Sequence, residues 1–556
     1  MKLKTSFFNK TLFMKNLTRF APAWVLYGLF MLLIVGSSVL TDTDFYLANN
    51  LSSLTMAFSA INVCYAFLVG QLLFGDLFQS RMCNALHALP IRREGWFLTH
   101  LTSALAFSLI PNTVFSLLLF AGLGKYWAAA LLWLTAATLQ YIFFFGVACI
   151  SALLVGNRFA MLVVYGIINF FSGIVLWLVM ELYIPHLYGV ELDYEPFLMF
   201  CPTIYFFNFE WFEAGKTAPI LQLTNGWGYL GICTAVGLGL MGLALLLYRK
   251  RNLEKAADFI AFPPAAPVFL VMYTFCAGTA LHIFCNLFLD EESIPFLIIG
   301  LAIGFFTGRM LLDRTIRVFR WKTALRFAIL LTVFGLTVLL TILDPIGFTR
   351  WVPEPEQVVK VDIYTSAQYR TARNEEYGLT DQQSIVDVLS IHQYAVDHPE
   401  MANNGELDVK LTFDYTMTDG SVKTRTLHVD TATVAGQSLV RLLSRPECIF
   451  GTRFTTVDSI VDRLESIRFY GEKEEYLIYD RKDLRSLVEA ILADCEMGTM
   501  AQANALRNAY QNWEWIYLEG KRMELPNGVI TNSAWDIFFT VDCTNITNWM
   551  IQHGYK

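Results

Sequence analysis

Two histidines, His100 and His282, lie well inside long apolar stretches of the sequence, where Arg309 is the one other ionisable side chain. Buried imidazoles transfer protons or bind metals when carboxylates or further histidines surround them. No such cluster accompanies either histidine. We therefore expect both to be hydrogen-bonded structural residues, and an ion-coupled transport mechanism or an intramembrane protease site is disfavoured.

Catalytic and nucleotide-binding motifs are also missing from the sequence, which contains no HExxH, GxSxG or DxDxDG pattern. Gly215-Lys216-Thr217 matches the end of a phosphate-binding loop, but Glu210 occupies the position of that loop's first glycine. We expect no catalytic residue, no metal site, no cofactor bound by this chain and no nucleic-acid partner. The acidic C-terminal part contains three cysteines, Cys448, Cys495 and Cys543. Because this number is odd, a complete disulfide framework is disfavoured, and the redox state of the three stays open.

The composition is that of a protein that crosses a membrane several times, since 55% of the 556 residues are hydrophobic and 16% are charged. A helix needs about 20 apolar residues to span a bilayer. Nine runs meet this length, and Arg309, in the eighth, must pair or reach the surface. The runs are Pro22–Leu40, Leu51–Phe74, Trp96–Leu123, Trp127–Val155, Phe159–Met180, Trp227–Tyr248, Val268–Leu289, Ile294–Leu312 and Phe327–Leu343.

Positive charge indicates how these runs are oriented. With the N-terminus inside, every Lys and Arg before Asp344 falls in an inner segment, except Lys125 and Lys216. The chain is therefore expected to be a multi-pass protein of the cytoplasmic membrane. Its acidic C-terminal part would then lie outside the cytoplasm.

The chain divides into five expected parts. The N-terminal part is either an interfacial amphipathic helix or a basic tail. The boundaries are 1–21 for this N-terminal helix, 22–251 for six spans, 252–267 for a cytoplasmic linker, 268–343 for three further spans and 344–556 for an acidic α+β extracytoplasmic domain. The fold class is thus a polytopic all-α membrane domain followed by an α+β domain.

The outer connection before the sixth span is too apolar for an ordinary loop and is broken by Pro196 and Pro202. It is predicted to form short interfacial or re-entrant helices over the outer mouth, and an aromatic belt without a transport role is the alternative. The candidate substrate contacts there are Phe200, Tyr205, Phe206, Phe207 and Trp211.

Small residues recur every four positions in two runs, where they allow close packing of helices. They are Gly300, Gly304 and Gly308 in the eighth span, and Gly231, Ala235 and Gly239 in the sixth.

The C-terminal part alternates between strand and helix patterns. Residues 407–417 and 421–429 flank Asp419-Gly420, which predicts a hairpin. The predicted helices are 382–396, 434–443, 456–467, 484–494 and 546–553.

A polar interruption, Phe74–Trp96, separates the second and third spans. A helix over 78–89 would place Met82, Leu86 and Leu89 on one side, and Pro90 would end it. Either this helix offers its apolar side to a cytoplasmic partner, or the segment is an ordinary intracellular loop.

This segment, the N-terminal helix, the six spans and the aromatic outer connection resemble the permease subunit of an ABC-2 type ABC transporter. The resemblance covers roughly residues 7–251. In that family the loop between spans 2 and 3 carries a coupling helix that docks on a cytoplasmic ATPase. The matching residues here are Asp76, Arg81, Leu86, Leu89, Pro90, Ile91 and Arg92, and Met82, His87 and Arg93 complete the candidate ATPase-coupling set.

The resemblance implies a permease subunit that has no ATPase of its own and that takes part in export. Its partners would be a cytoplasmic ABC ATPase, which uses ATP and Mg²⁺, and a second permease subunit in a homodimer or heterodimer within the lipid bilayer. The last three spans and the acidic domain depart from the six-span pattern. One alternative is a membrane-anchored sensor whose outer domain binds a ligand. Another is a polytopic membrane enzyme, which the missing catalytic motifs disfavour.

Overall fold

The computed structural model divides into two compact units, which are described separately. The membrane unit comprises Met1–Val179 and Asp193–Gly335, and the C-terminal unit comprises Met180–Leu192 and Leu336–Lys556. The structure describes residues 7–41, 44–88, 91–190, 195–208, 211–214, 221–224, 226–289, 294–365, 378–398, 408–430, 433–450, 454–470, 475–500, 514–524, 530–539 and 542–555.

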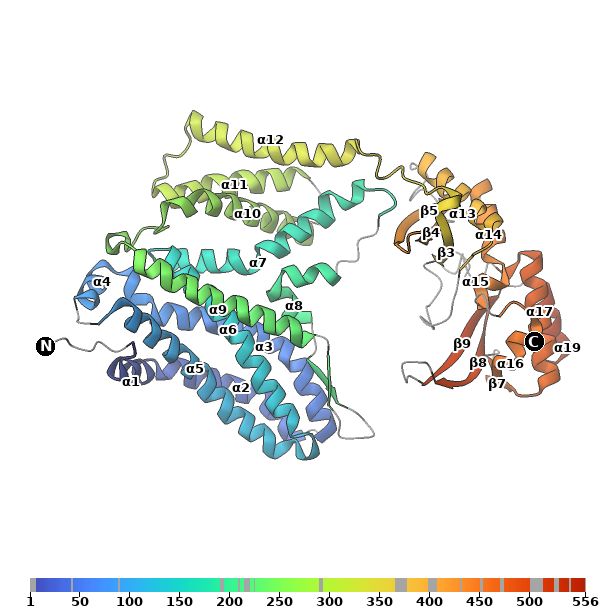
Figure 1. Ribbon diagram of the computed structural model, residues 1–556, viewed down its shortest axis with the longest axis horizontal. Coiled ribbons are helices and arrows are strands. Elements are labelled where there is room, and N and C mark those ends of the chain that lie inside the picture. Colours follow the sequence, from blue (N-terminus) through green and yellow to red (C-terminus); the bar gives the residue numbers. More distant parts are fainter. Residues whose placement is uncertain are drawn as a thin grey trace. The chain divides into compact units, whose positions relative to one another are not determined.

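The membrane unit is built from long helices joined by short turns (Figure 1). With 3₁₀ helices labelled η, its elements are α1 (Lys10–Arg19), α2 (Ala21–Thr41), α3 (Asp44–Leu73), η1 (Gly75–Phe78), α4 (Ser80–His87), α5 (Arg93–Gly122), η2 (Gly124–Tyr126), α6 (Ala128–Leu154), α7 (Arg158–Leu182), η4 (Glu195–Phe200), α8 (Pro202–Asn208), β1 (Phe212–Ala214), β2 (Leu221–Leu223), α9 (Gly226–Lys250), η5 (Leu253–Lys255), η6 (Pro263–Ala265), α10 (Ala266–Leu289), α11 (Ile294–Asp313) and α12 (Trp321–Leu343).

Seven helical segments of the described chain are long and apolar enough to cross a membrane, which confirms the multi-span prediction. They are Arg93–Phe120, Ala128–Leu154, Arg158–His186, Gly226–Lys250, Pro263–Phe288, Ile294–Asp313 and Trp321–Leu343. The first two predicted spans coincide with α2 and α3, whose described apolar stretches, Ala21–Leu33 and Ala57–Leu73, are shorter. The count of nine spans stays a prediction.

Helix α6 forms the centre of the membrane unit and is more buried than the other spanning helices. It packs closely on α9 through Gly146 and Gly237, where a Cβ on Gly146 would lie 2.3 Å from the carbonyl oxygen of Gly237. The predicted packing row on α9 is wrong, because Gly231 and Gly239 have no neighbouring atom within 4 Å of a built Cβ. The contact uses a different face of the same helix.

The second glycine row is confirmed. A Cβ on Gly300 would lie 2.7 Å from the carbonyl oxygen of Gly278, and one on Gly304 would lie 2.9 Å from that of Thr274. A Cβ on Gly308 would lie 2.8 Å from the ring of Tyr273. Helices α10 and α11 can therefore approach backbone to backbone.

The C-terminal unit contains two antiparallel sheets with helices beside them (Figure 1). Its elements are η3 (Ile184–His186), η7 (Pro355–Gln357), β3 (Val358–Thr365), α13 (Gln382–Asp397), β4 (Asp408–Met417), β5 (Val422–Asp430), α14 (Val434–Leu443), α15 (Pro446–Phe450), α16 (Val457–Arg463), β6 (Leu464–Tyr470), β7 (Glu475–Ile478), α17 (Arg481–Met497), β8 (Glu514–Glu524), β9 (Ile530–Phe539) and α19 (Thr544–Gln552).

The first sheet has the order β3-β4-β5 and confirms the predicted hairpin between β4 and β5. Asp419 accepts a hydrogen bond from the Ser421 backbone N–H at 2.8 Å, and Gly420 has a φ of +81°. This left-handed conformation favours glycine at the turn. Asp381 caps the N-terminus of helix α13, since its carboxylate accepts from the Ser384 N–H at 2.8 Å, and the helix buries one face against a core shared with the sheet.

The second sheet has the order β7-β6-β8-β9 and a separate hydrophobic core shared with α16, α17 and α19. The predicted helix over 456–467 is wrong beyond Arg463, where β6 begins. Thr456 caps the short helix α16. The residues after α16 form β6, which pairs with β7 on one side and β8 on the other. Strand pairing on both sides thus overrides the local helical pattern.

The end of α7 and the turn after it belong to the C-terminal unit. The Thr426 backbone N–H donates to the Gly189 carbonyl oxygen at 3.0 Å, and Tyr188 packs on the core of the first sheet. The C-terminal unit therefore includes a segment from the middle of the chain, the end of α12 and the residues that follow it.

Candidate functional site

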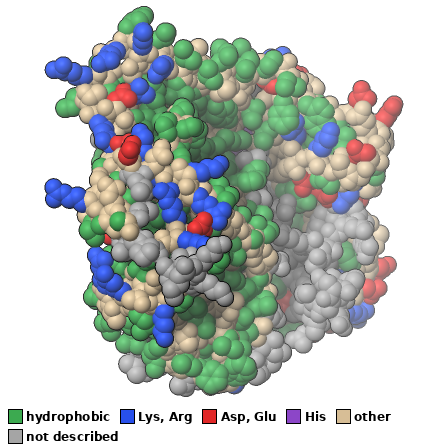
Figure 2. Space-filling view, turned by 60° about the vertical axis from the view of Figure 1, so that its left-hand side comes forward, with side chains coloured by type: hydrophobic (Ala, Val, Ile, Leu, Met, Phe, Trp, Pro, Cys, Tyr) green, Lys and Arg blue, Asp and Glu red, His purple; other side chains and the backbone are tan. Residues whose placement is uncertain are grey.

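Helices α1 and α4 and the turn between α11 and α12 lie at one end of the membrane unit (Figure 1), and this end carries many lysine and arginine side chains (Figure 2). Figure 2 shows these blue side chains spread over that end with few acidic side chains among them. We call this surface the basic end. It contains the segment that the sequence predicts to be the partner-binding loop.

The predicted helix over 78–89 is divided in the structure. Leu77 and Phe78 are buried in η1, Gln79 is extended, and α4 then runs to His87. Met82 is 40% exposed on α4, whereas Cys83 is buried. Arg81 is exposed.

The other residues of the predicted apolar side have no described side chain. Leu89 and Pro90 lie outside the described residues, and the side chains of Leu86 and His87 do as well. Met82 is therefore the described apolar residue with which this surface can be tested.

Asp76 is half-buried in η1, close to three cationic side chains. Burial raises the pKa of its carboxyl, while the positive charges of Arg19, Lys15 and Arg158 oppose that shift. The positive charges of α1 and of the start of α7 therefore act on Asp76 in the segment before α4.

Arg93 begins α5 and reaches the C-terminal end of α9. Its guanidinium donates to the carbonyl oxygens of Tyr248 at 3.3 Å, Arg249 at 3.1 Å and Arg251 at 3.2 Å. These carbonyls have no partner inside their own helix, and a cation at a helix C-terminus is favoured. Next to it, Glu94 pairs with Arg249 at 2.9 Å.

The remaining predicted coupling residues lie next to Arg93 in the sequence. Ile91 packs against the core of the membrane unit, and Arg92 is exposed. Arg92, Arg93, Glu94 and Arg249 line an open cavity of about 550 Å³ at the basic end. The structure thus brings the end of the predicted coupling segment together with the end of α9.

Arg251 is a buried residue that the sequence did not single out. It is 3% exposed and donates to the carbonyl oxygens of Ala152 at 3.0 Å, Leu153 at 3.1 Å and Leu77 at 3.4 Å. Burial lowers the pKa of its guanidinium to about 10. It forms no ion pair with a carboxylate of the described chain, so the C-terminus of α6 and η1 supply its acceptors.

The segment after Arg251 folds back on the turn between α6 and α7. Gly156 in this turn exchanges two backbone hydrogen bonds with the segment. The Gly156 N–H donates to the Asp258 carbonyl oxygen at 2.9 Å, and the Gly156 carbonyl oxygen accepts from the Ala257 N–H at 2.7 Å. A Cβ at Gly156 would lie 2.3 Å from the Lys255 carbonyl oxygen. The predicted linker is therefore a packed part of the basic end, and η5 within it contacts α4.

The aromatic outer connection forms η4, α8 and the small β1–β2 hairpin, in agreement with the predicted short helices. Phe206 and Trp211 are fully buried, Tyr205 and Phe207 are half-buried, and Phe200 is 71% exposed. In this conformation Phe200 is the candidate substrate contact with the most open surface.

A network of uncharged polar side chains beneath α8 was not anticipated from the sequence. The Tyr27 hydroxyl donates to Asn62 at 3.2 Å and Asn112 at 3.1 Å, and Asn62 donates to Gln140 at 3.2 Å. Ser59 donates to Gln140 and to the Phe206 carbonyl oxygen. These residues come from separate apolar runs, and their scattered amides and hydroxyls were the available signal.

His100 and His282 lie on different helices, each with hydrogen-bonding partners of its own. His100 Nδ1 is 3.0 Å from the Asn16 side-chain nitrogen, which fastens α1 to α5. His282 Nε2 is 3.2 Å from the Asn286 side-chain nitrogen. The described residues contain no group of three or more His, Cys, Asp or Glu placed to hold a metal.

These features define a helical membrane protein with an α+β C-terminal part. No family model, curated protein or solved structure matches the chain. Its function must therefore be inferred from its own residues.

Proposed function

We propose that this chain is the permease subunit of an ATP-driven transporter and that a separate cytoplasmic ABC ATPase binds its basic end. The ATPase would bind ATP and Mg²⁺, and a second permease subunit would complete the transporter. The proposal includes nine spans in a cytoplasmic membrane, the N-terminus inside, the C-terminal unit outside and, by resemblance, export of the substrate.

The observation that supports this proposal best is the set of contacts around α4. Arg251 connects η1, which precedes α4, to the C-terminus of α6, and Arg93, which follows α4, holds the C-terminus of α9. A displacement of α4 can therefore be transmitted through these contacts to two spanning helices, α6 and α9. Close-packed elements transmit such displacements because they do not deform continuously.

The central helix carries the displacement further in this proposal. Helices α6 and α9 touch at Gly146 and Gly237, and Gln140 on α6 takes part in the polar network beneath α8. Movement of α6 would change hydrogen bonds of α2, α3 and α5 together. Alternating access would require such a concerted rearrangement of several helices.

The test is copurification of the ATPase with the full chain after Met82→Asp, which puts a charge on the exposed apolar surface of α4. Met14→Asp is the matched control, since Met14 is 48% exposed on α1 at the same end, against 40% for Met82. We expect Met82→Asp to reduce ATPase recovery at least tenfold and Met14→Asp to leave it unchanged. Equal recovery with both variants, at equal expression, would show that α4 is not the docking site.

A membrane-anchored sensor is the second candidate, because the chain leading out of α7 is part of the C-terminal unit through the Thr426–Gly189 hydrogen bond. Ligand binding to that unit could then act on α7 directly. Failure of any ATPase to copurify with the wild-type chain would favour this candidate.

A further inference from the structure

The turn between α11 and α12 exposes three large apolar side chains. Ile316 is 78% exposed, Phe319 is 72% exposed and Trp321 is 81% exposed. All three lie within six residues of one another at the basic end. Such a cluster is unfavourable in water and typical of a segment that rests in the boundary between lipid headgroups and acyl chains.

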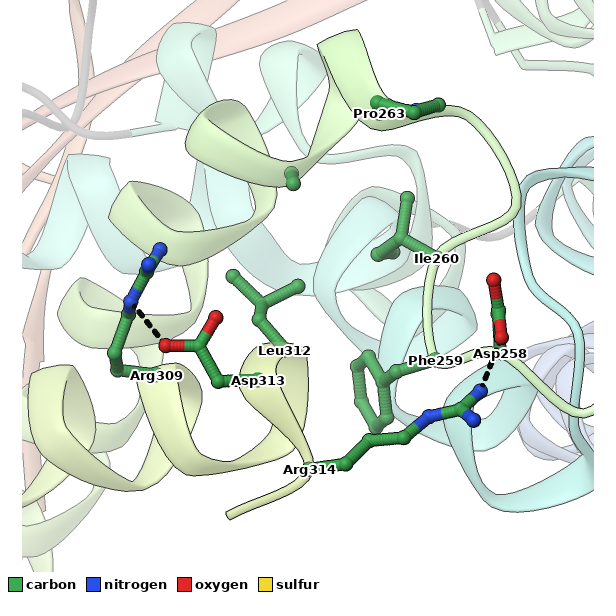
Figure 3. A pocket seen from close by; sticks show the side chains of 9 residues that line it. Asp258, Phe259, Ile260, Pro263, Arg309, Leu312, Asp313 and Arg314 are labelled. Carbon is green, nitrogen blue, oxygen red and sulfur yellow. Dashed lines mark hydrogen bonds and ion pairs between the residues drawn. The ribbon is translucent and has the colours of Figure 1, made fainter. Parts of the chain in front are cut away.

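Basic side chains alternate with these apolar ones. Arg317, Arg320, Lys322 and Arg326 are exposed, and none forms an ion pair with a carboxylate of the described chain. Arg309 and Arg314 differ, because Arg309 pairs with Asp313 at 2.8 Å and Arg314 with Asp258 at 2.6 Å (Figure 3). The four positive charges between Arg317 and Arg326 therefore have no counterion in the described part of the chain.

The turn is held in place from both sides. Arg314 also donates to the Ala257 carbonyl oxygen at 2.5 Å, and Val318 is 2% exposed. The Phe319 ring stacks on Phe306 with its centroid 5.0 Å away. The surface that carries the apolar and basic side chains is therefore a fixed part of the fold.

A cavity of about 360 Å³ lies beside the turn, and the ion pairs that hold the turn line it (Figure 3). Its lining contains Arg309 and Arg314 together with Asp313 and Asp258, so its charges are balanced within the chain. An anion would have to displace a carboxylate there, whereas the outward-facing basic residues need no such exchange.

We propose that the turn from Arg314 to Lys322, extended by Arg326, binds the anionic phospholipid headgroups of the leaflet at the basic end. Arginine guanidinium groups suit phosphate oxygens, and each Lys or Arg near an anionic membrane surface adds to the attraction. Trp321 and Phe319 anchor the segment at the depth of the headgroups. Helix α12, which begins at Trp321, has no buried residue among those described, so lipid can reach it from the headgroups inward.

The experiment uses the purified full chain in nanodiscs containing phosphatidylglycerol and phosphatidylcholine, followed by counting of the lipids retained after release into detergent. We expect the wild type to retain phosphatidylglycerol preferentially. Arg317→Gln with Arg320→Gln should lower this preference about tenfold, because two charges near the surface are removed. Arg317→Lys with Arg320→Lys should keep most of it.

Lys10→Gln with Lys250→Gln is the matched control, since it removes two exposed charges from the same end. This control should retain the wild-type preference, and an equal loss would mean that overall charge rather than the turn binds the lipid. Phe319→Ser with Trp321→Ser should release phosphatidylglycerol as well. Unchanged retention in that variant, or full competition by inorganic phosphate, would identify a site for soluble anions and overturn the proposal.

A third outcome would also overturn it. If Arg317→Gln with Arg320→Gln retained phosphatidylglycerol but lost a copurifying ATPase, the turn would be a protein contact. Because lipid retention is measured without an ATPase, the lipid proposal and the proposed transport function can fail independently.

Discussion

Two groups of arginines at the basic end differ from the carboxylate-paired Arg249, Arg309 and Arg314 and from each other in their partners. Arg251 and Arg93 donate to carbonyl oxygens at helix C-termini, where the helix dipole favours a cation. Arg317 and Arg320 are exposed and remain available to an anion from outside the chain. Both groups satisfy the same positive-inside pattern, so the sequence alone does not separate them.

His392 in the C-terminal unit provides a prediction about pH. Its ring is buried, with Nδ1 2.9 Å from the Tyr415 hydroxyl, and burial together with the nearby Arg425 lowers its pKa to about 4. In the unfolded chain histidine titrates near pH 6.5. As the pH falls from about 6.5 to about 4, the unfolded state takes up a proton that the folded state excludes.

Stability should therefore be lost over that interval, by up to about 3 kcal/mol of unfolding free energy. Urea unfolding of the full chain at pH 7.5 and pH 4.5 measures it. His392→Gln should remove most of the difference between the two pH values, and His398→Gln, at the end of the same helix, should retain it. The same acid sensitivity in both variants would assign the effect to other groups.

At the scale of elements, the contact between α6 and α9 yields a test with a control two residues away. A Cβ on Gly237 would lie 2.6 Å from the Phe143 Cα, whereas a Cβ on Gly239 meets no atom within 4 Å. Gly237→Ala should force the helices apart and cost about 1–3 kcal/mol, because a tight contact tolerates no added methyl group.

Gly239→Ala should be neutral or stabilise the helix by about 0.5–1 kcal/mol, since alanine loses less backbone freedom on folding than glycine. Thermal unfolding of both variants in detergent gives the comparison. A lower midpoint for Gly239→Ala than for Gly237→Ala would contradict the packing of α6 on α9.

These glycines also show how far the sequence could predict the fold. The spacing of Gly300, Gly304 and Gly308 identified a real contact, because α11 presents that row to a single neighbour. On α9 the same spacing at Gly231 and Gly239 was misleading. Spacing identifies a face of a helix, but which face meets a neighbour depends on the packing of helices far apart in the sequence.

The candidate site was predictable to a similar degree. The sequence located the interruption around α4 from its polarity and proline, both of which are local signals. It could not identify Arg251, whose role depends on carbonyl groups almost one hundred residues earlier, or the network around Gln140. In the C-terminal unit the hairpin at Asp419 was predictable from its turn, whereas β6 required two partner strands to be recognised.

At the scale of the whole molecule, the number of spans decides the side on which each end of the chain lies. Seven helical segments qualify as spans, and α2 and α3 would raise the number to nine if both cross. Because both counts are odd, the two ends of the chain should lie on opposite sides of the membrane. A single crossing by the α2–α3 pair would instead give an even number.

Reporter fusions can distinguish these arrangements. With the basic end in the cytoplasm, a reporter that is active only outside should be inactive after Arg251, where the chain lies at the basic end, and active after Leu343 and after Lys556. A second reporter that is active only inside should work at the N-terminus. Matching activity of one reporter at both chain ends would require an even number of spans, which would put the N-terminus on the same side of the membrane as the C-terminal unit. Because seven candidate spans follow α4 in the described chain, the C-terminal unit would still lie across the membrane from α4, and the predicted inside position of the N-terminus would be wrong.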